Sequence, residues 1–478
     1  MTFSFYWHDY ETWGADPRRD RACQFAGVRT DEDFNPLGDP LVVYCKPSND
    51  MLPQPIACMI TGITPQYALQ HGMVEAEFIR AIHQQLAAPG TCGVGYNSLR
   101  FDDEVTRNTL YRNLYDPYAR EWQNGSSRWD IIDMVRLTHA LRPEGIEWPK
   151  NDLGVTSFRL EELSVANGIE HAAAHDALSD VYATIGMAKL VKQRQPKLYD
   201  YLFNSRAKQA VAARLNLQKR EAVLHVSAMY PAVQGCIAMV MPLIKHPANP
   251  NGIVVYDLRY DPEPLLSLSV EALHQRLFTP KDQLAEGIER LPIKTVHINK
   301  CPVVVPISTL DGQSAERWQI DLTQAERHRG TLLKANQFMV KIEQAHQQRE
   351  FEAVSDPDLA IYSGGFFSSS DRQRMNQIVE SEPETLSSFP QVFDDPRLVE
   401  MLFRYRARNW PETLNQQERE RWEEYRSERL LMEDGGGSIS LDDYLQTLDQ
   451  LEADPELSQD KRALIPDLLA WAEQVAPL

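Results

Sequence analysis

The sequence predicts an α/β domain at the N-terminus, then a mixed, β-rich domain and then a helical C-terminal domain. Residues 1–200 alternate short apolar runs with segments of helical apolar spacing, which is typical of layered α/β folds. Residues 201–350 are richer in strand patterns, and helical patterns dominate residues 351–478. Because 478 residues are too many for one ordinary domain, we expect these three segments to be separate domains.

In the first segment, apolar runs bounded by turn residues predict strands, and apolar residues at helical spacing predict helices. The expected strands span residues 3–9, 24–30, 41–46 and 91–96. The expected helices span residues 74–86, 102–114, 129–141, 158–166 and 176–192.

The same patterns predict the strands and helices of the other two segments. The middle segment is expected to form strands at residues 222–226, 236–243, 252–258 and 295–305, and helices at 273–278 and 324–344. The last segment is expected to form helices at residues 371–380, 397–407, 415–431, 441–451 and 461–475. The glycine-rich stretch at 435–438 indicates a flexible loop tip.

The net charge of −19 argues against a general nucleic-acid binder, whose surface is usually basic. The charge is uneven, however: residues 1–203 carry −8, residues 204–350 carry +4, and residues 351–478 carry −15. The middle segment is therefore the candidate for contact with a polyanion.

Composition also bears on location. No run approaches the roughly 18 apolar residues of a membrane span, and the first residues lack the pattern of a signal peptide. The six cysteines are scattered and form no CxxC pair, which argues against zinc ribbons and redox motifs. We expect a cytoplasmic, monomeric protein with reduced thiols and no membrane partner.

Four carboxylates and one histidine are the candidate catalytic residues. Asp9 and Glu11 follow an apolar run, and the alternation of side chains along a strand places both on one face. Asp102 begins a helix after a second apolar strand, and the segment His175–Asp180 supplies a histidine and a further acid. Each motif alone is weak, because most charged residues lie on solvated surface. Their position at strand ends and on an apolar helix favours a shared site.

This set of residues has the chemistry of a metal site. Carboxylate oxygens suit Mg²⁺ or Mn²⁺ better than Zn²⁺. Two such ions can activate water and stabilise the leaving oxygen in phosphodiester hydrolysis. His175 lies five residues before Asp180, so we expect it on a loop before the helix, where it could deprotonate the water.

The ordered set Asp9, Glu11, Asp102, His175 and Asp180 resembles the DEDD exonuclease superfamily, in the branch whose third motif is His-x4-Asp. The chain is also similar to the bacterial exonuclease I family. The strings that carry this resemblance lie at residues 8–12, 60–65, 100–108, 296–302 and 405–409.

This resemblance implies a ribonuclease-H-like exonuclease domain, an SH3-like middle domain and a helical tail. It implies processive 3′→5′ digestion of single-stranded DNA to mononucleotides with two divalent ions, Mg²⁺ or in its place Mn²⁺. Asp9, Glu11, Asp102 and Asp180 would bind the metals, and His175 would be the general base.

The resemblance also implies contacts with substrate and partner. Glu11 and Arg159 would bind the substrate, and Arg142 would bind the C-terminal tail of single-stranded-DNA-binding protein.

Further substrate contacts are suggested by aromatic and basic residues near Asp102. Arg107, Tyr118 and Trp122 belong to a cluster that combines rings with cations, as single-strand binders do. Arg136 could extend this path or be an ordinary surface arginine. Three arginines at 404, 406 and 408 could likewise contact a polyanion or pair with local acids.

Two alternatives to a DNA exonuclease remain open. The first is an RNA-directed exonuclease on the same scaffold, since the choice between DNA and RNA depends on contacts to the 2′-hydroxyl. The second is a catalytically silent scaffold that binds nucleic acid or a protein, which the complete set of repelling carboxylates disfavours.

Overall fold

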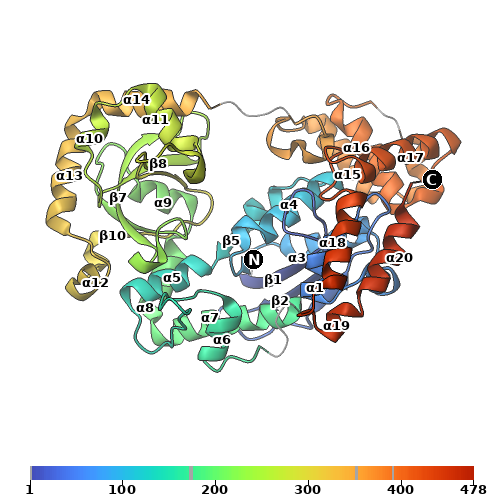
Figure 1. Cartoon of the computed structure of the whole chain (residues 1–478), viewed down its shortest axis with the longest axis horizontal. Helices are drawn as coiled ribbons and strands as arrows, with labels where there is room; N and C mark the ends of the chain where they lie inside the picture. Colours follow the sequence, from blue (N-terminus) through green and yellow to red (C-terminus); the bar gives the residue numbers. More distant parts are fainter. Residues whose placement is uncertain (1–2, 172–175, 350–353, 390–391, 478) are drawn as a thin grey trace. The chain divides into compact units, whose positions relative to one another are not determined.

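The computed structural model describes residues 3–171, 176–349, 354–389 and 392–477 (Figure 1). The chain forms two compact units. Unit 1 comprises Met1–Arg128, His171–Ile185 and Ala353–Leu478, and unit 2 comprises Trp129–Glu170 and Gly186–Glu352. The helical C-terminal segment therefore shares a unit with most of the N-terminal α/β segment.

Unit 1 is built on a five-stranded sheet of order β3-β2-β1-β4-β5. Strand β1 is central and pairs antiparallel with β2 and parallel with β4. Its strands are β1 (Ser4–Thr12), β2 (Ala22–Thr30), β3 (Leu41–Tyr44), β4 (Thr91–Gly95) and β5 (Ser127–Asp130). The mixed strand directions and the helices around the sheet confirm the predicted α/β class.

The helices of the N-terminal part cover this sheet. They are α1 (Pro55–Thr61), α2 (Pro65–His71), α3 (Glu75–Leu86) and α4 (Asp102–Arg112). Later in the chain, α7 (Ala177–Arg194) belongs to unit 1 up to Ile185 and to unit 2 from Gly186. Phe78, Ile79 and Ile82 of α3 pack against Tyr6 and Tyr10 of β1 in one buried cluster. One side of β1 is thus filled by apolar packing, and its other side carries the acids.

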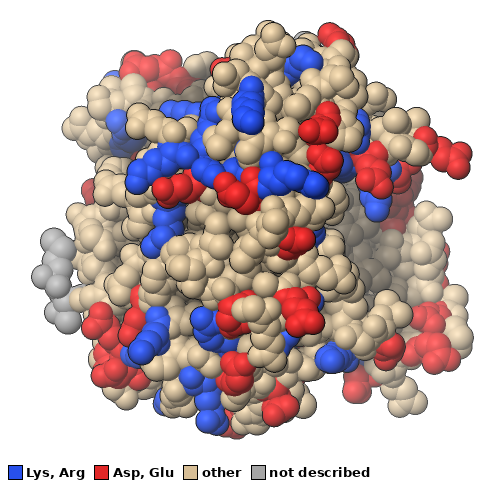
Figure 2. Space-filling view, turned by 90° about the vertical axis from the view of Figure 1, so that its left-hand side faces the viewer, with Lys and Arg blue, Asp and Glu red and all other residues tan. Residues whose placement is uncertain are grey.

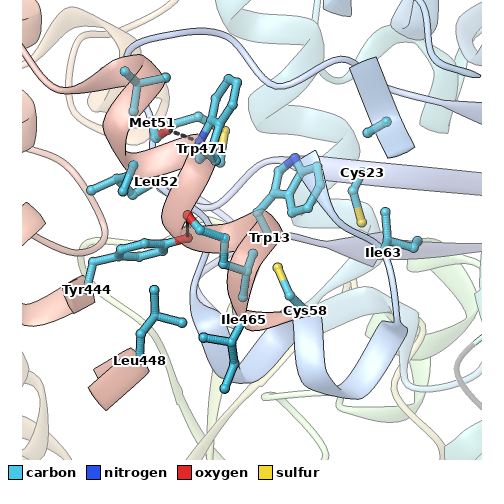
Figure 3. Packing of buried hydrophobic residues seen from close by; sticks show 14 of the residues in the cluster. Trp13, Cys23, Met51, Leu52, Cys58, Ile63, Tyr444, Leu448, Ile465 and Trp471 are labelled. Carbon is cyan, nitrogen blue, oxygen red and sulfur yellow. Dashed lines mark hydrogen bonds between the residues drawn. The ribbon is translucent and has the colours of Figure 1, made fainter. Parts of the chain in front are cut away.

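The C-terminal helices pack directly on this domain. They are α15 (Ser369–Glu380), α16 (Arg397–Asn409), α17 (Gln416–Leu431), α18 (Leu441–Ala453), α19 (Gln459–Arg462) and α20 (Ile465–Val475). Figure 3 shows Trp13 and Cys58 among Tyr444, Ile465 and Trp471 in a single buried cluster. The Trp471 indole donates a hydrogen bond of 3.2 Å to the Met51 carbonyl. The first and last parts of the chain therefore share one hydrophobic core.

A buried ion cluster joins the same two parts. Asp50, which has no exposed surface, pairs with Arg21 at 2.8 Å and with Arg408 at 2.9 Å. Burial alone would raise the pKa of Asp50, but the charges of Arg21 and Arg408 outweigh it and hold the pKa well below its usual value. Arg408 also pairs with Asp358 at 2.7 Å, and Asp358 with Arg404 at 3.1 Å.

These pairs decide between the two interpretations of the basic residues at 404–408. Arg404 and Arg408 belong to the buried cluster, and Arg406 pairs with Glu418 at 2.6 Å. All three side chains are less than a tenth exposed. They therefore support the fold by pairing with local acids and do not form a surface for a polyanion.

Unit 2 contains a second five-stranded sheet, of order β10-β6-β7-β8-β9. Its strands are β6 (Val223–Val226), β7 (Ile237–Lys245), β8 (Gly252–Asp257), β9 (Ile293–His297) and β10 (Val304–Pro306). All its neighbouring strands pair antiparallel. Its helices are α5 (Ile132–Leu141), α6 (Leu160–Ala166), α8 (Pro196–Ser205), α9 (Lys208–Arg214), α10 (Glu263–Leu266), α11 (Val270–Phe278), α12 (Gly312–Arg317), α13 (Leu322–Lys334) and α14 (Asn336–Gln347).

Two predicted elements of unit 2 are in fact pairs of elements. The strand expected at 295–305 is divided into β9 and β10, which lie at opposite edges of the sheet, and Cys301 between them has a positive φ of 41°. The helix expected at 324–344 is interrupted at Ala335, whose φ of −93° and ψ of 57° are not helical. In both segments, apolar residues on each side of the break suggested a single element.

The surface of unit 2 carries charges of both signs. Figure 2 shows Lys and Arg gathered in a band across the upper part of the viewed face, with Asp and Glu among them. In the parts of the chain that the structure describes, no helix is both long enough and apolar enough to cross a membrane.

Asp50 provides a test of the ion cluster. Asp50→Asn should lower the free energy of unfolding by about 3–5 kcal/mol at neutral pH, because it leaves buried arginines without their partner. Since its folded pKa is depressed, the contribution of Asp50 is present above the unfolded pKa of about 3.9 and is lost as the pH falls through the folded pKa. Denaturant unfolding at several pH values measures this.

The control is Arg18→Ala, which removes an exposed pair between Arg18 and Asp16. Such pairs contribute about 0–1 kcal/mol, so this variant should unfold like the parent. Equal stability of Asp50→Asn and the parent at neutral pH would contradict the role of the cluster.

Candidate active site

Asp9 and Glu11 lie on the central strand β1, on the side opposite the apolar contacts with α3. Their spacing of two places them on one face of the strand, as predicted. The strand does not end at residue 9, as the sequence suggested. It continues to Thr12 because β2 pairs with it up to a register shift after Glu11. Both carboxylates therefore project from a part of β1 that is paired with β2, which restricts their movement.

Asp102 is the first residue of α4, which follows β4 and a short turn. Its Oδ1 atom accepts a hydrogen bond of 3.1 Å from the backbone N–H of Tyr10. The Thr106 hydroxyl lies 2.8 Å from the Asp102 carbonyl and 3.0 Å from the Tyr10 hydroxyl. These bonds attach the start of α4 to β1 beside the acidic pair.

Asp180 lies in the first turn of α7 and completes a cluster of acids. One carboxylate oxygen from each of Asp9, Glu11 and Asp180 lies within 4.8 Å of the others. The Nε2 atom of His171 contacts the Asp180 carboxylate. His175, predicted to be the general base, lies outside the described residues.

The crowding of these acids shifts their pKa values. Burial, and then the charges of Asp102 and Asp180, raise the pKa of Asp9 well above its usual value. Burial and the charge of Asp180 raise the pKa of Glu11 to about 8. With all carboxylates ionised, the site is stable only when cations offset their mutual repulsion.

The donor set fits hard divalent cations. It consists of carboxylate oxygens, the ligands that Mg²⁺, Mn²⁺ and Ca²⁺ prefer, and a thiolate is not among the grouped ligands in the described part of the chain. Asp102, held against Tyr10, supplies a further acid at the edge of the same cluster.

Two residues of the site were missed by the sequence interpretation. Asp176 is close enough to raise the pKa values of Asp9 and Glu11, and His171 contacts Asp180. The signal for both was present, since they lie in the same short segment as Asp180. A polar residue near a motif is, however, indistinguishable from a solvated one until the fold is known.

The residues expected to bind substrate in unit 1 lie beyond the start of α4. Arg107 is buried, and its guanidinium pairs with Glu104 at 2.8 Å and Glu121 at 2.7 Å. The same guanidinium lies 5.4 Å from the centre of the Tyr118 ring. Trp122 is 66% exposed. The charge of Arg107 is thus used within the protein, while the ring of Trp122 faces solvent.

The three other candidate arginines belong to unit 2. Arg136 pairs with Asp133 at 2.7 Å and is mostly buried. Arg159 pairs with Glu161, yet its side chain is 67% exposed. Arg142 pairs with Asp311 at 3.1 Å, donates to the Thr309 carbonyl and is 39% exposed. Arg142 and Arg159 can therefore reach a ligand without unfolding of their surroundings.

Known protein families match all three segments of the chain. The model described as Exonuclease matches residues 6–188, the Exonuclease I SH3-like domain matches residues 206–348, and the Exonuclease I C-terminal domain matches residues 355–475. Exodeoxyribonuclease I of Escherichia coli K12 is 46% identical over 473 residues, which cover 99% of this chain and 98% of that protein.

Solved structures agree with these matches. Exonuclease I from Methylocaldum szegediense has a TM-score of 0.95 and 52% identity, over 99% of both chains. The zinc-bound form of the E. coli exonuclease I–single-stranded DNA complex has a TM-score of 0.94 and 45% identity, over 99% and 100% of the chains. The complex of E. coli exonuclease I with SSB-Ct has a TM-score of 0.92 and 44% identity, over 100% of both chains.

A ribonuclease-H-like sheet that holds a cluster of carboxylates, of which Glu11 is buried, together with the match over residues 6–188, defines a metal-dependent exonuclease. The SH3-like and helical domains that follow it are those of one group of such enzymes. The chain belongs to the exodeoxyribonuclease I family, and the enzyme is a DNA-hydrolysing phosphodiesterase that uses divalent metal ions. The predicted fold class and family resemblance are confirmed.

The raised pKa values yield a test of the acidic cluster. A carboxyl whose folded pKa is raised contributes stability below its unfolded pKa and loses it as the pH rises through the folded value. In EDTA, the contribution of Glu11 to the free energy of unfolding should therefore fall as the pH rises from about 4.3, the unfolded pKa of Glu, toward 8. Asp9→Asn should remove nuclease activity and yet melt higher than the parent at pH 8, because one repelling charge is gone.

Thermal unfolding in EDTA and with a divalent ion, from pH 5 to pH 9, measures these effects. Asp152→Asn, on an exposed turn, is the control and should follow the parent. A lower melting temperature for Asp9→Asn than for the parent at pH 8 in EDTA would show that the acids do not repel one another in the folded protein.

Proposed function

We propose that this enzyme digests single-stranded DNA processively from the 3′ end to 5′-mononucleotides, with two Mg²⁺ ions that Mn²⁺ can replace. The observation that carries the proposal is the grouping of Asp9, Glu11 and Asp180 within 4.8 Å, in a chain that matches exodeoxyribonuclease I from end to end. Its role is in DNA repair and recombination. On the sequence grounds given above, we also propose a cytoplasmic monomer.

The residues of the site have separable tasks. Asp9, Glu11, Asp102 and Asp180 hold the metal ions, and bound ions of this kind activate water and stabilise the leaving oxygen. β1 and α4 orient these acids through the Tyr10–Asp102 bond, so the ligands are positioned before the substrate arrives. Glu11 also contacts the terminal nucleotide. His175 accepts the proton from the attacking water.

Each unit offers rings or cations outside the metal site that can contact DNA. Trp122 and Tyr118 stack on bases, and Arg159 contacts a phosphate. Arg107 supports the Tyr118 ring from one side, because its own charge is already paired. Arg136 of unit 2 would contact DNA only by giving up its pair with Asp133.

Arg142 provides the contact to the partner protein. Its partner Asp311 is a half-exposed carboxylate, which the terminal carboxylate of an incoming peptide can replace. The complex of E. coli exonuclease I with SSB-Ct supports a peptide of this kind as the ligand.

Substrate choice tests the proposed reaction. Incubation with 3′-labelled single-stranded DNA, the matching duplex or RNA, with Mg²⁺ or EDTA, should release labelled mononucleotide only from single-stranded DNA with Mg²⁺. Asp180→Ala should remove this release while the folding of the protein is retained. Preferential release from RNA would support the RNA-directed alternative, and no release from any substrate would leave only the silent scaffold.

The partner proposal is tested by Arg142→Ala. Loss of a charge-assisted bond to a carboxylate should weaken binding of the C-terminal peptide of single-stranded-DNA-binding protein by about 10–100-fold. Fluorescence anisotropy measures the affinity, and digestion of protein-free DNA should stay unchanged. The affinity of Arg142→Ala for the peptide is compared with that of Arg317→Ala, which removes an arginine on the neighbouring α12. Unchanged affinity in Arg142→Ala would exclude the assigned role.

A further inference from the structure

Gln24 of β2 is a buried amide that contacts the start of α7. It is 2% exposed and lies directly opposite Glu11 in the β1–β2 register. Its Oε1 atom accepts a hydrogen bond of 3.4 Å from the backbone N–H of Ala177, the first residue of α7. Its Nε2 atom donates to Asp176 Oδ1 at 3.3 Å. One side chain thus binds both a backbone donor and an acidic acceptor at the beginning of this helix.

The second oxygen of Asp176 binds the helix itself. Asp176 Oδ2 accepts from the backbone N–H of Ser179 at 3.2 Å, and the Asp176 carbonyl accepts from Asp180 N–H at 3.1 Å. Asp176 is therefore the cap of the first turn, where a side-chain oxygen satisfies a backbone donor that has no partner within the helix. The turn that carries Asp180 is connected through Asp176 to Gln24.

The amide is itself fixed from the other side. Gln24 Nε2 also donates to the Tyr44 hydroxyl at 3.0 Å, on the neighbouring strand β3. With two acceptors for the NH₂ group and one donor for the oxygen, the orientation of the amide is determined. A side chain held in this way can set the position of the helix that it contacts.

We propose that Gln24 is a positioning residue that fixes the first turn of α7 on β2 and so places Asp180 against Asp9 and Glu11 for metal binding. Gln24 touches neither metal nor substrate. It acts through Asp176 and the backbone of Ala177, and the inference rests on the proposed metal-binding role of the three acids.

The neutral charge of the amide is part of this role. Gln24 donates to Asp176 and lies opposite Glu11, and these two acids interact with Asp9, Asp102 and Asp180. A cationic side chain at residue 24 would compete with the metal ions, and an anionic one would repel Asp176. The amide of Gln24 supplies both a donor and an acceptor without charge.

Gln24→Glu replaces the amide NH₂ group with an oxygen and keeps the size of the side chain. It retains the acceptor for Ala177 N–H but replaces the donor to Asp176 with a repelling oxygen. Loss of a group that orients a ligand typically weakens metal binding by about 10–100-fold, and we expect this for Mn²⁺ binding to the metal-free full-length variant. kcat should fall with it, while KM for a single-stranded oligonucleotide should stay within about 2-fold of the parent.

The double variant Q24E/D176N exchanges donor and acceptor between the two positions. Asparagine is also a good helix cap, so Asp176→Asn keeps the bond to Ser179 N–H. Mn²⁺ affinity and kcat of the double variant should recover to within about 3-fold of the parent, which a general loss of packing would not allow. Gln66→Glu, whose amide donates to the Asp467 carbonyl on α20, is the matched control and should behave like the parent.

Electron paramagnetic resonance of Mn²⁺, thermal unfolding and steady-state digestion of an oligonucleotide complete the test. Parent-like Mn²⁺ affinity in Gln24→Glu, or a double variant no better than Gln24→Glu, would overturn the role of Gln24. Absence of Mn²⁺ binding in the parent would instead overturn the metal site itself, so the two failures are distinguishable.

Discussion

The repulsion among the carboxylates around β1 is the constraint on which the rest of unit 1 depends. Asp9 and Glu11 project from one strand, and Asp102 and Asp180 are brought to them by α4 and α7. Burial and like charges raise the pKa values of Asp9 and Glu11, so the folded protein holds these groups together at a cost in stability. Such an arrangement persists only when several contacts fix each element.

These contacts come from different directions. The Tyr10 N–H holds Asp102, Gln24 holds the start of α7, and the apolar contacts of α3 with Tyr6 and Tyr10 fix the strand from behind. Each element that carries an acid is therefore attached to the central sheet by at least one buried polar bond or apolar cluster. Metal ions would then complete a site whose ligands need little reorganisation.

The same unit uses its arginines as internal connections. Asp50 and its arginine partners join the loop after β3 to α16 and α17, and Arg107 joins α4 to the segment around Glu121. Buried pairs of this kind add little net stability but are costly to break, so they favour one arrangement of the first and last parts of the chain. Many arginines of this acidic chain are thus paired with acids inside the fold. Its DNA contacts must come from the few cations that stay accessible, such as Arg159.

How far the sequence predicts this structure depends on whether the signal is local. Asp9, Glu11, Asp102 and Asp180 were predictable because each sits at a recognisable position on a strand or helix. The roles of Arg404 and Arg408 were not, because their partners Asp50 and Asp358 lie far away in the sequence. The division of residues 295–305 into two edge strands was not predicted, although Asn299, Lys300 and Pro302 interrupt the apolar residues, since periodicity reports burial and not which strand is the neighbour.

Gln24 shows why some functional residues leave no trace in a sequence. It lies near the start of a strand with an ordinary apolar pattern, and the strand itself contains no acid. Its partners, Asp176 and Ala177, are about 150 residues away. Its importance arises from the register that places it opposite Glu11, and from the need for a neutral group with both donor and acceptor beside Asp176. The property that makes it suitable, its lack of charge, is also the one that hides it.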